Sequence, residues 1–125
     1  MGDLSANFSR HEFACKCGCG FDAINPAVVE ILQILRNVMR REIRVTSGCR
    51  CFSRNAAVGG VRDSQHICGK AADITCDLGA EIMFVILRLL YEAKRIPNLA
   101  YCQLYKTENF VHIDVGPDRV KRFVE

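Results

Sequence analysis

Apolar residues recur at helical spacing in two long stretches of the chain. A helix is predicted over residues 26–40, because Asn25 can cap its start and Pro26 suits its first turn. Its apolar face is formed by Val28, Ile31, Leu32, Leu35, Val38 and Met39. A second, strongly apolar helix is predicted over residues 78–94, with Asp77 as its cap. Both helices therefore have one face suited to burial.

Alternating apolar and polar residues predict four strands in other parts of the chain. These strands are residues 43–46, 71–76, 99–105 and 110–115. A short polar turn at residues 106–109 joins the last two as a hairpin, and residues 47–69 are predicted to be irregular. The pattern indicates an α+β fold in which two main helices pack on one face of a small, mainly antiparallel sheet.

Composition narrows the class of protein. The 125 residues have room for a single domain, residues 1–125. The net charge of +3 comes from 17 basic and 14 acidic residues without a dense basic block, so we expect no nucleic-acid partner. The longest apolar run, residues 82–87, is too short to cross a bilayer, and the start lacks the pattern of a secretory signal. We expect a monomer that is made in the cytoplasm and does not insert into membranes.

Strand periodicity places two potential metal ligands on the same side of the sheet. Asp73 and His112 both belong to the face opposite the apolar residues of their strands. His66 lies in the preceding loop, where the flexible Gly69 can let it fold back beside Asp73. Two imidazoles and one carboxylate are a ligand set of catalytic zinc sites, although each residue alone is more often structural.

Two segments resemble a known family of enzymes. Residues 64–73 read Ser-Gln-His-Ile-Cys-Gly-Lys-Ala-Ala-Asp and residues 110–114 read Phe-Val-His-Ile-Asp. Both are similar to motifs of the zinc D-alanyl-D-alanine carboxypeptidases and L-alanyl-D-glutamate endopeptidases. The resemblance implies the hedgehog/DD-peptidase fold, peptidoglycan peptides as substrate, and one catalytic zinc ion held by His66, Asp73 and His112. It implies hydrolysis by metal-activated water and leaves open which peptide bond is cut.

The resemblance also implies roles for residues around the metal. Arg50 matches an arginine that binds substrate or stabilises developing negative charge. Ser64 is expected to bind substrate or cap its loop, and Asp114 to contact substrate or orient a ligand histidine. Relatives often carry an acidic proton shuttle three residues before the second histidine, where this chain has Asn109. Glu108 is therefore the candidate general base.

Eight cysteines give the chain a second possible chemistry. Five of them, in two short segments, could meet: Cys15, Cys17, Cys19, Cys49 and Cys51. A structural zinc ion or disulfides would use such a group, but C-x-C-x-C is less diagnostic of zinc than paired C-x-x-C motifs. Reduced, partly buried thiols are the favoured interpretation.

Two other functions compete with the zinc peptidase. One is a non-catalytic zinc-containing module that binds peptidoglycan or a protein partner, which the presence of Asn109 favours. The other is a cysteine-based metal or redox protein. A peptidase without a signal peptide would reach the cell wall after lysis, by holin-type export or by delivery in a particle.

Overall fold

The computed structural model describes residues 2–125. Three α-helices, a short 3₁₀ helix and five strands occur in this part of the chain. Their order is η1 (Arg10–Phe13), α1 (Pro26–Met39), β1 (Arg44–Ser47), α2 (Phe52–Ala57), β2 (Ala71–Thr75), α3 (Ala80–Glu92), β3 (Tyr101–Tyr105), β4 (Phe110–Asp114) and β5 (Phe123–Val124). None of the helices in residues 2–125 has the length and apolar character needed to cross a membrane.

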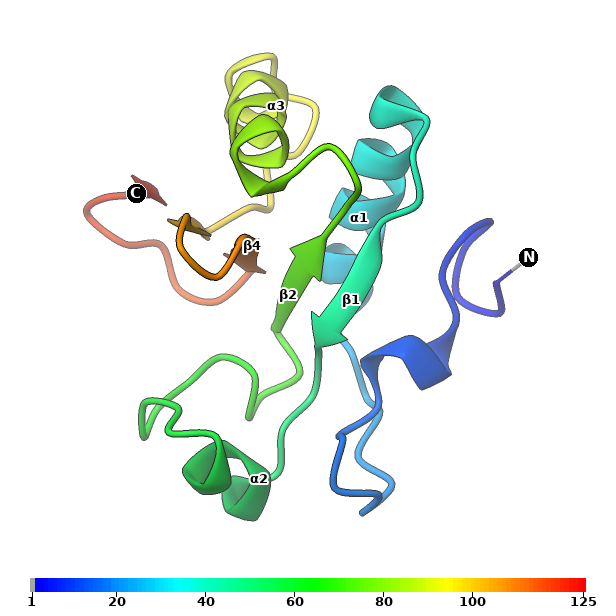
Figure 1. Ribbon diagram of the computed structural model, residues 1–125, viewed down its shortest axis with the longest axis vertical. Coiled ribbons are helices and arrows are strands. Elements are labelled where there is room, and N and C mark those ends of the chain that lie inside the picture. The colour runs from blue at the N-terminus through cyan, green and yellow to red at the C-terminus, as the bar shows by residue number, and fades with distance from the viewer. Residues whose placement is uncertain (1) are drawn as a thin grey trace.

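The strands form one sheet with the order β1-β2-β4-β3-β5. All neighbours are antiparallel except β3 and β5, which are parallel, so the predicted α+β fold with a mainly antiparallel sheet is confirmed. Figure 1 shows β1 and β2 side by side, with α1 behind them and α3 beyond the end of β2. The two-residue strand β5 was not predicted, because its length gives no periodic pattern.

Helix α1 begins where its sequence predicts. The side chain of Asn25 accepts a hydrogen bond from the backbone N–H of Ala27 at 2.9 Å, and Pro26 occupies the first helical position. The helix ends before Arg40, which has a left-handed backbone with φ of 56°. The predicted apolar face is buried except for Val38, which is 46% exposed, so assigning Val38 to the core was wrong.

Helix α3 begins later than predicted, and Asp77 is not its cap. Gly79 has φ of 94°, a backbone conformation that interrupts a helix, so the regular turns begin only at Ala80. The backbone N–H of Ala80 is capped from elsewhere in the chain, by the side-chain oxygen of Asn109 at 2.9 Å. Asp77 instead forms an exposed ion pair with Arg41 at 3.2 Å.

The segment predicted to be irregular contains a short helix, α2. It has six residues, too few for a recognisable apolar period. The loop that follows is held to it by the side chain of Asn55, which donates to the carbonyl of Val61 at 2.8 Å. This loop leads to His66 and then to strand β2.

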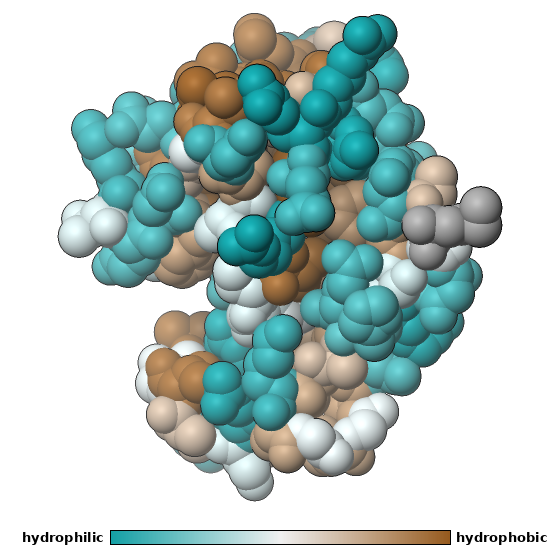
Figure 2. Space-filling view, turned by 45° about the vertical axis from the view of Figure 1, so that its right-hand side comes forward, coloured by the Kyte–Doolittle hydropathy of each residue, from teal (hydrophilic) through white to brown (hydrophobic). Residues whose placement is uncertain are grey.

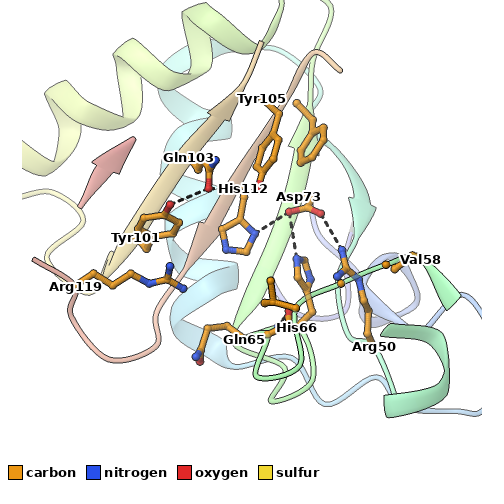
Figure 3. Close-up of a pocket in the computed structure, with 15 residues that line it drawn as sticks. Arg50, Val58, Gln65, His66, Asp73, Tyr101, Gln103, Tyr105, His112 and Arg119 are labelled. Atoms are coloured by element: carbon orange, nitrogen blue, oxygen red, sulfur yellow. Dashed lines mark hydrogen bonds and ion pairs between the residues drawn. The ribbon is translucent and has the colours of Figure 1, made fainter. Parts of the chain in front are cut away.

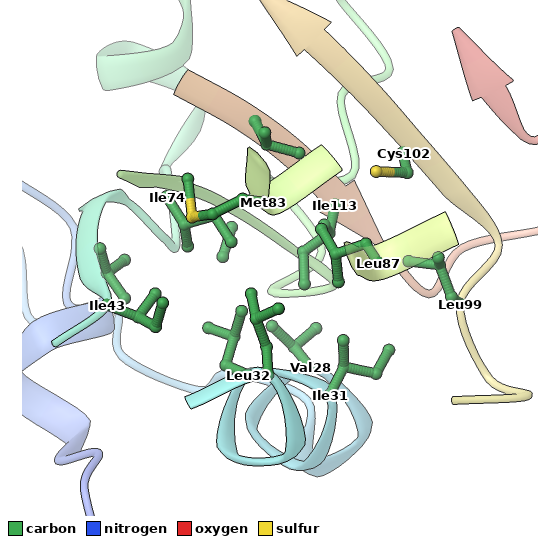
Figure 4. Packing of buried hydrophobic residues seen from close by; sticks show 14 of the residues in the cluster. Val28, Ile31, Leu32, Ile43, Ile74, Met83, Leu87, Leu99, Cys102 and Ile113 are labelled. Atoms are coloured by element: carbon green, nitrogen blue, oxygen red, sulfur yellow. The ribbon is translucent and has the colours of Figure 1, made fainter. Parts of the chain in front are cut away.

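The hydrophobic core lies between the two long helices and one face of the sheet (Figure 4). Ile74 of β2 and Ile113 of β4 meet side chains from α1 and α3 in this cluster. Because strand side chains alternate between faces, the residues next to them project from the opposite face. That face is free to carry polar groups, among them Asp73 and His112.

Candidate active site

A pocket of about 310 Å³ lies on the face of the sheet opposite the core. Its floor contains Asp73, His112 and Gln103, which are in register across β2, β4 and β3. One wall is the loop after α2, and Arg119 of the carboxyl-terminal segment lies on the other side. The space-filling view is deeply indented between the lobe that contains α2 and the rest of the molecule (Figure 2).

His66, Asp73 and His112 come together in this pocket (Figure 3). The strand faces predicted this for Asp73 and His112, and the loop before β2 predicted it for His66. One carboxylate oxygen, Asp73 Oδ1, lies 3.2 Å from His66 Nε2 and 2.9 Å from His112 Nδ1. A potential ligand atom of each of the three residues lies within 4.8 Å of the other two, and His66 and Asp73 are buried. The structure thus gathers three side chains of the types that bind zinc.

A tight turn before β2 brings His66 back to Asp73. Gly69 has φ of 68°, and a Cβ there would collide with the carbonyl oxygen of Ala23, so only glycine fits this close approach. The N–H of Gly69 donates to the carbonyl of His66 at 3.2 Å. The glycine between His66 and Asp73 in the sequence motif is therefore needed for the turn that brings these two residues together.

Each histidine ring is also held at its second nitrogen. His66 Nδ1 lies 2.7 Å from the carbonyl oxygen of Gly48, and His112 Nε2 lies 2.8 Å from Asp114 Oδ2. The carbonyl of Gly48 can only accept a hydrogen bond, so His66 Nδ1 is the donor in its contact, whereas His112 has a carboxylate at each ring nitrogen. Partners of this kind fix the orientation of rings that bind metals.

The two histidine rings, when neutral, have too few N–H groups for the acceptors around them. A neutral His66 uses its one N–H on Gly48, which leaves the lone pair of Nε2 facing the acceptor oxygen of Asp73. A neutral His112 likewise has one N–H for two carboxylates, those of Asp73 and Asp114. Two added protons, or one divalent cation, would satisfy both rings. The donor set therefore fits a zinc ion.

The pKa values of Asp73 and His112 are shifted in directions that also favour a positive charge beside Asp73. Burial alone would raise the pKa of Asp73, but hydrogen bonds from His112 and His66, together with their charge, hold it well below its usual range. Burial would lower the pKa of His112, whereas hydrogen bonds to Asp114 and Asp73 and the negative charge of both carboxylates raise it. The surroundings of His112 thus stabilise a positive charge.

Comparison with known proteins identifies the family of the chain. The sequence model of the family Peptidase M15 matches residues 6–114, a range that contains His66, Asp73 and His112. The chain belongs to the peptidase M15 family. It is also 36% identical over 90 residues, 68% of its length, to a Haemophilus influenzae protein named probable peptidoglycan L,D-endopeptidase MepK. The chain spans 44% of that relative's length. The predicted family resemblance is confirmed.

Arg50 lies in the pocket, where its guanidinium contacts the second oxygen of Asp73. Its Nη2 is 3.2 Å from Asp73 Oδ2, the oxygen that the histidines do not share. Its other nitrogens bond to Ser47 Oγ at 3.0 Å and Asn55 Oδ1 at 3.2 Å. These contacts show Arg50 holding the carboxylate in place, while its predicted role toward substrate stays a prediction.

Ser64 and Asp114, both predicted to bind substrate, occupy different places. Ser64 lines the pocket, and its hydroxyl accepts a hydrogen bond from the backbone N–H of His66 at 3.2 Å. Asp114 is fully buried behind His112 and does not line the pocket. Its position favours orienting His112 over direct contact with substrate.

The structure does not bring Glu108 to the pocket. Glu108 and Asn109 are exposed in the turn between β3 and β4, and neither lines the pocket. Asn109 caps α3 instead, which gives this residue a structural role. Among residues 2–125, Asp73 contributes the one carboxylate of the pocket lining.

Sequence reasoning did not identify several polar residues of the pocket. Tyr101, Gln103 and Tyr105 line it from β3, and their alternation with the buried Cys102 was a signal that could have found them. Tyr101 donates its hydroxyl to Gln103 Oε1 at 2.8 Å. Arg119 stacks 3.9 Å above the Tyr101 ring centroid, but it follows the last long strand and carries no sequence signal.

A second group of potential metal ligands lies outside this pocket. Cys15, Cys17, Cys19 and Cys51 each have a sulfur within 4.8 Å of the other three. Cys49 is not part of the group, which corrects the expectation that five thiols could meet. It is 1% exposed and belongs to the hydrophobic core, where its backbone N–H donates to the carbonyl of Phe13 at 2.8 Å.

Proposed function

We propose that the chain is a zinc-dependent peptidase that hydrolyses a peptide bond in the peptide part of bacterial peptidoglycan, with His66, Asp73 and His112 as zinc ligands. The observation that carries the proposal is that His66 Nε2 and His112 Nδ1 lie 3.2 Å and 2.9 Å from the same carboxylate oxygen of Asp73. Membership of the peptidase M15 family supports peptide hydrolysis. The name of the Haemophilus influenzae relative supports peptidoglycan as the substrate.

The residues around the ligands would keep the site ready for zinc. Gly48 and Asp114 fix the two rings, so that His66 presents Nε2 and His112 presents Nδ1 to Asp73. Arg50 holds the other oxygen of Asp73. A bound zinc ion would polarise the scissile carbonyl and lower the pKa of a water molecule. The protein's contribution is to fix the ligand set beside an open pocket.

The pocket lining suggests how a cell-wall peptide would be recognised. The guanidinium of Arg119 lies over Tyr101 at the pocket and would pair with a substrate carboxylate. Gln103 offers an amide to the peptide backbone, and the exposed Val58 and Val61 provide an apolar wall. D-Ala-D-Ala carboxypeptidase and L-Ala-D-Glu endopeptidase activities would both use such contacts.

The direct test is digestion of purified peptidoglycan. The zinc-loaded protein should release new amino groups, and mass spectrometry of the products identifies the bond that is cut. Removal of zinc by a chelator should abolish release, and addition of zinc should restore it. The His112→Ala variant should be inactive and should bind less zinc. Hydrolysis that survives both chelation and His112→Ala would refute the proposal.

Glu108 is proposed as the residue that carries protons during hydrolysis. It lies in the turn that precedes β4, the strand of His112, and would have to approach the pocket when substrate binds. Glu108→Gln should then lower kcat by about 100-fold or more while zinc content stays unchanged. Glu30→Gln, which alters an exposed glutamate of α1, is the matched control. Equal activity of the two variants would remove Glu108 from the mechanism.

A second candidate is a zinc-containing module that binds peptidoglycan without cutting it. The observation that favours it is that Asp73, a proposed metal ligand, is the pocket's one carboxylate in residues 2–125. This function predicts a zinc-loaded protein that sediments with peptidoglycan and releases no amino groups. The digestion experiment separates the two functions directly.

A further inference from the structure

The amino-terminal arm and the start of α2 meet at a cluster of four sulfur atoms. Cys15 Sγ lies 3.5 Å from Cys17 Sγ and 3.9 Å from Cys51 Sγ, and the last two are 3.6 Å apart. Cys19 Sγ completes the group within 4.8 Å of the others. Segments more than thirty residues apart in sequence therefore place four thiols around one point.

The spacing of the sulfurs suits a tetrahedral metal ion. With zinc–sulfur bonds of about 2.3 Å, sulfurs at the corners of a tetrahedron lie about 3.8 Å apart. The three distances given above lie close to this value on both sides. Sulfurs joined in a disulfide lie much closer, at about 2 Å. The cluster thus has the dimensions of a thiolate metal site.

The surrounding backbone is arranged to support thiolates. The N–H of Cys51 donates to Cys15 Sγ, and the N–H of Arg54 donates to Cys51 Sγ, both at 3.4 Å. Hydrogen bonds that sulfur accepts favour its negatively charged form. The loop itself is closed by the N–H of Cys15, which donates to the carbonyl of Phe21 at 2.8 Å.

Two glycines allow the loop to wrap around the sulfurs. Gly18 and Gly20 have φ of 81° and 93°, a left-handed backbone that glycine adopts without strain. The N–H of Gly18 donates to the carbonyl of Cys15 at 3.2 Å, which tightens the turn between the first and third cysteines. The pattern of alternating cysteine and glycine is thus what this close turn requires.

We propose that Cys15, Cys17, Cys19 and Cys51 bind a second, structural zinc ion that fastens the amino-terminal arm to the start of α2. Four protein ligands leave no open position for substrate, as in other structural zinc sites. The ion would also stabilise the pocket, because Cys51 directly follows Arg50, whose guanidinium holds Asp73. This second site is independent of the proposed catalytic zinc.

Zinc content of purified variants tests the proposal. The double variant Cys17→Ser/Cys19→Ser, prepared under reducing conditions, should contain one zinc ion fewer per chain than the wild type. The control Cys68→Ser changes an exposed thiol outside the cluster and should contain as much zinc as the wild type. His112→Ala should lose only the ion of the histidine site. The loss caused by the cysteine variant is expected even if the histidine site holds no metal.

Cobalt substitution of the wild type tests the ligands without depending on how a variant folds. Wild type and His112→Ala reconstituted with Co²⁺ should both show the intense near-ultraviolet band of thiolate-to-cobalt charge transfer. The band should disappear in the cysteine double variant. Absence of the band in reduced wild type would overturn the proposal, as would equal zinc content in the double variant and Cys68→Ser. Disulfides among the four cysteines of the freshly purified protein would also overturn it.

Discussion

At the scale of single residues, Asp114 is expected to affect the proposed zinc site through its contact with His112. It is fully buried and lies 2.8 Å from His112 Nε2. We predict that Asp114→Asn, which keeps the size of the side chain but removes its charge, weakens zinc binding at the histidine site by about 10- to 100-fold. Competition with a chelator of known affinity measures this change.

The control for this variant is Asp118→Asn. Asp118 is exposed and pairs with Arg122, so its loss should leave zinc affinity unchanged. Circular dichroism of both variants checks that the fold is retained. If Asp114→Asn bound zinc as tightly as the wild type, the hydrogen bond to His112 would have no part in metal binding.

Cys102 provides a prediction about thiol reactivity. Burial, together with the nearby negative charge of Asp114, raises the pKa of Cys102, so little of it is thiolate. Cys68 is exposed. In the native protein, iodoacetamide should label Cys68 long before Cys102, and peptide mass spectrometry after timed quenching measures both. Similar rates would show that β3 opens readily; in denaturant the difference should vanish.

How far single residues of the site could be predicted depended on local geometry. Strand alternation was sufficient to place Asp73 and His112 on one face, because a period of two fixes the side of every residue. It could not place Arg119, whose position depends on packing against Tyr101, which is distant in sequence. The same holds for Asn109, whose partner is the start of another element.

At the scale of elements, the start of α3 depends on a side chain from the β3–β4 turn. Asn109 Oδ1 accepts the hydrogen bond of Ala80 N–H, and Asn109 itself has a left-handed backbone with φ of 59°. Asn109→Ala loses this cap and places alanine in a strained conformation. The free energy of unfolding should fall by about 1–3 kcal/mol, as measured by urea denaturation at a fixed zinc concentration.

The variant Asn109→Gly separates the loss of the helix cap from the backbone strain. Glycine tolerates the left-handed backbone but cannot accept the hydrogen bond, so this variant should lose about 0.5–2 kcal/mol, the contribution of the cap alone. If both variants were as stable as the wild type, the contact between Asn109 and α3 would not contribute to stability.

Helices and strands could be predicted from the sequence when they were long or had clear capping residues. Helix α1 was predicted correctly because Asn25 and Pro26 mark its start and a long apolar period marks its face. The six residues of α2 were missed, because such a short helix has no period and here is capped by Cys51. Strand β5 was missed because its two residues are defined by pairing with β3, a contact distant in sequence.

At the scale of the whole molecule, the proposed zinc ion of the histidine site would join three parts of the fold. His66 belongs to the loop after α2, Asp73 to β2 and His112 to β4. An ion that binds only when these parts are assembled stabilises the folded state by RT ln(1 + [Zn]/Kd). The gain should therefore depend on free zinc concentration and on the intact ligand set.

Thermal and urea unfolding in zinc buffers measure this gain in the free energy of unfolding. At free zinc 100-fold above the Kd of the histidine site, the wild type should gain about 2.7 kcal/mol more than His112→Ala, each relative to its own metal-free form. Any contribution of the cysteine cluster is present in both proteins and cancels in the comparison. Equal gains would mean that the zinc that stabilises the fold is not bound by His112, and the proposed ligand set would have to be abandoned.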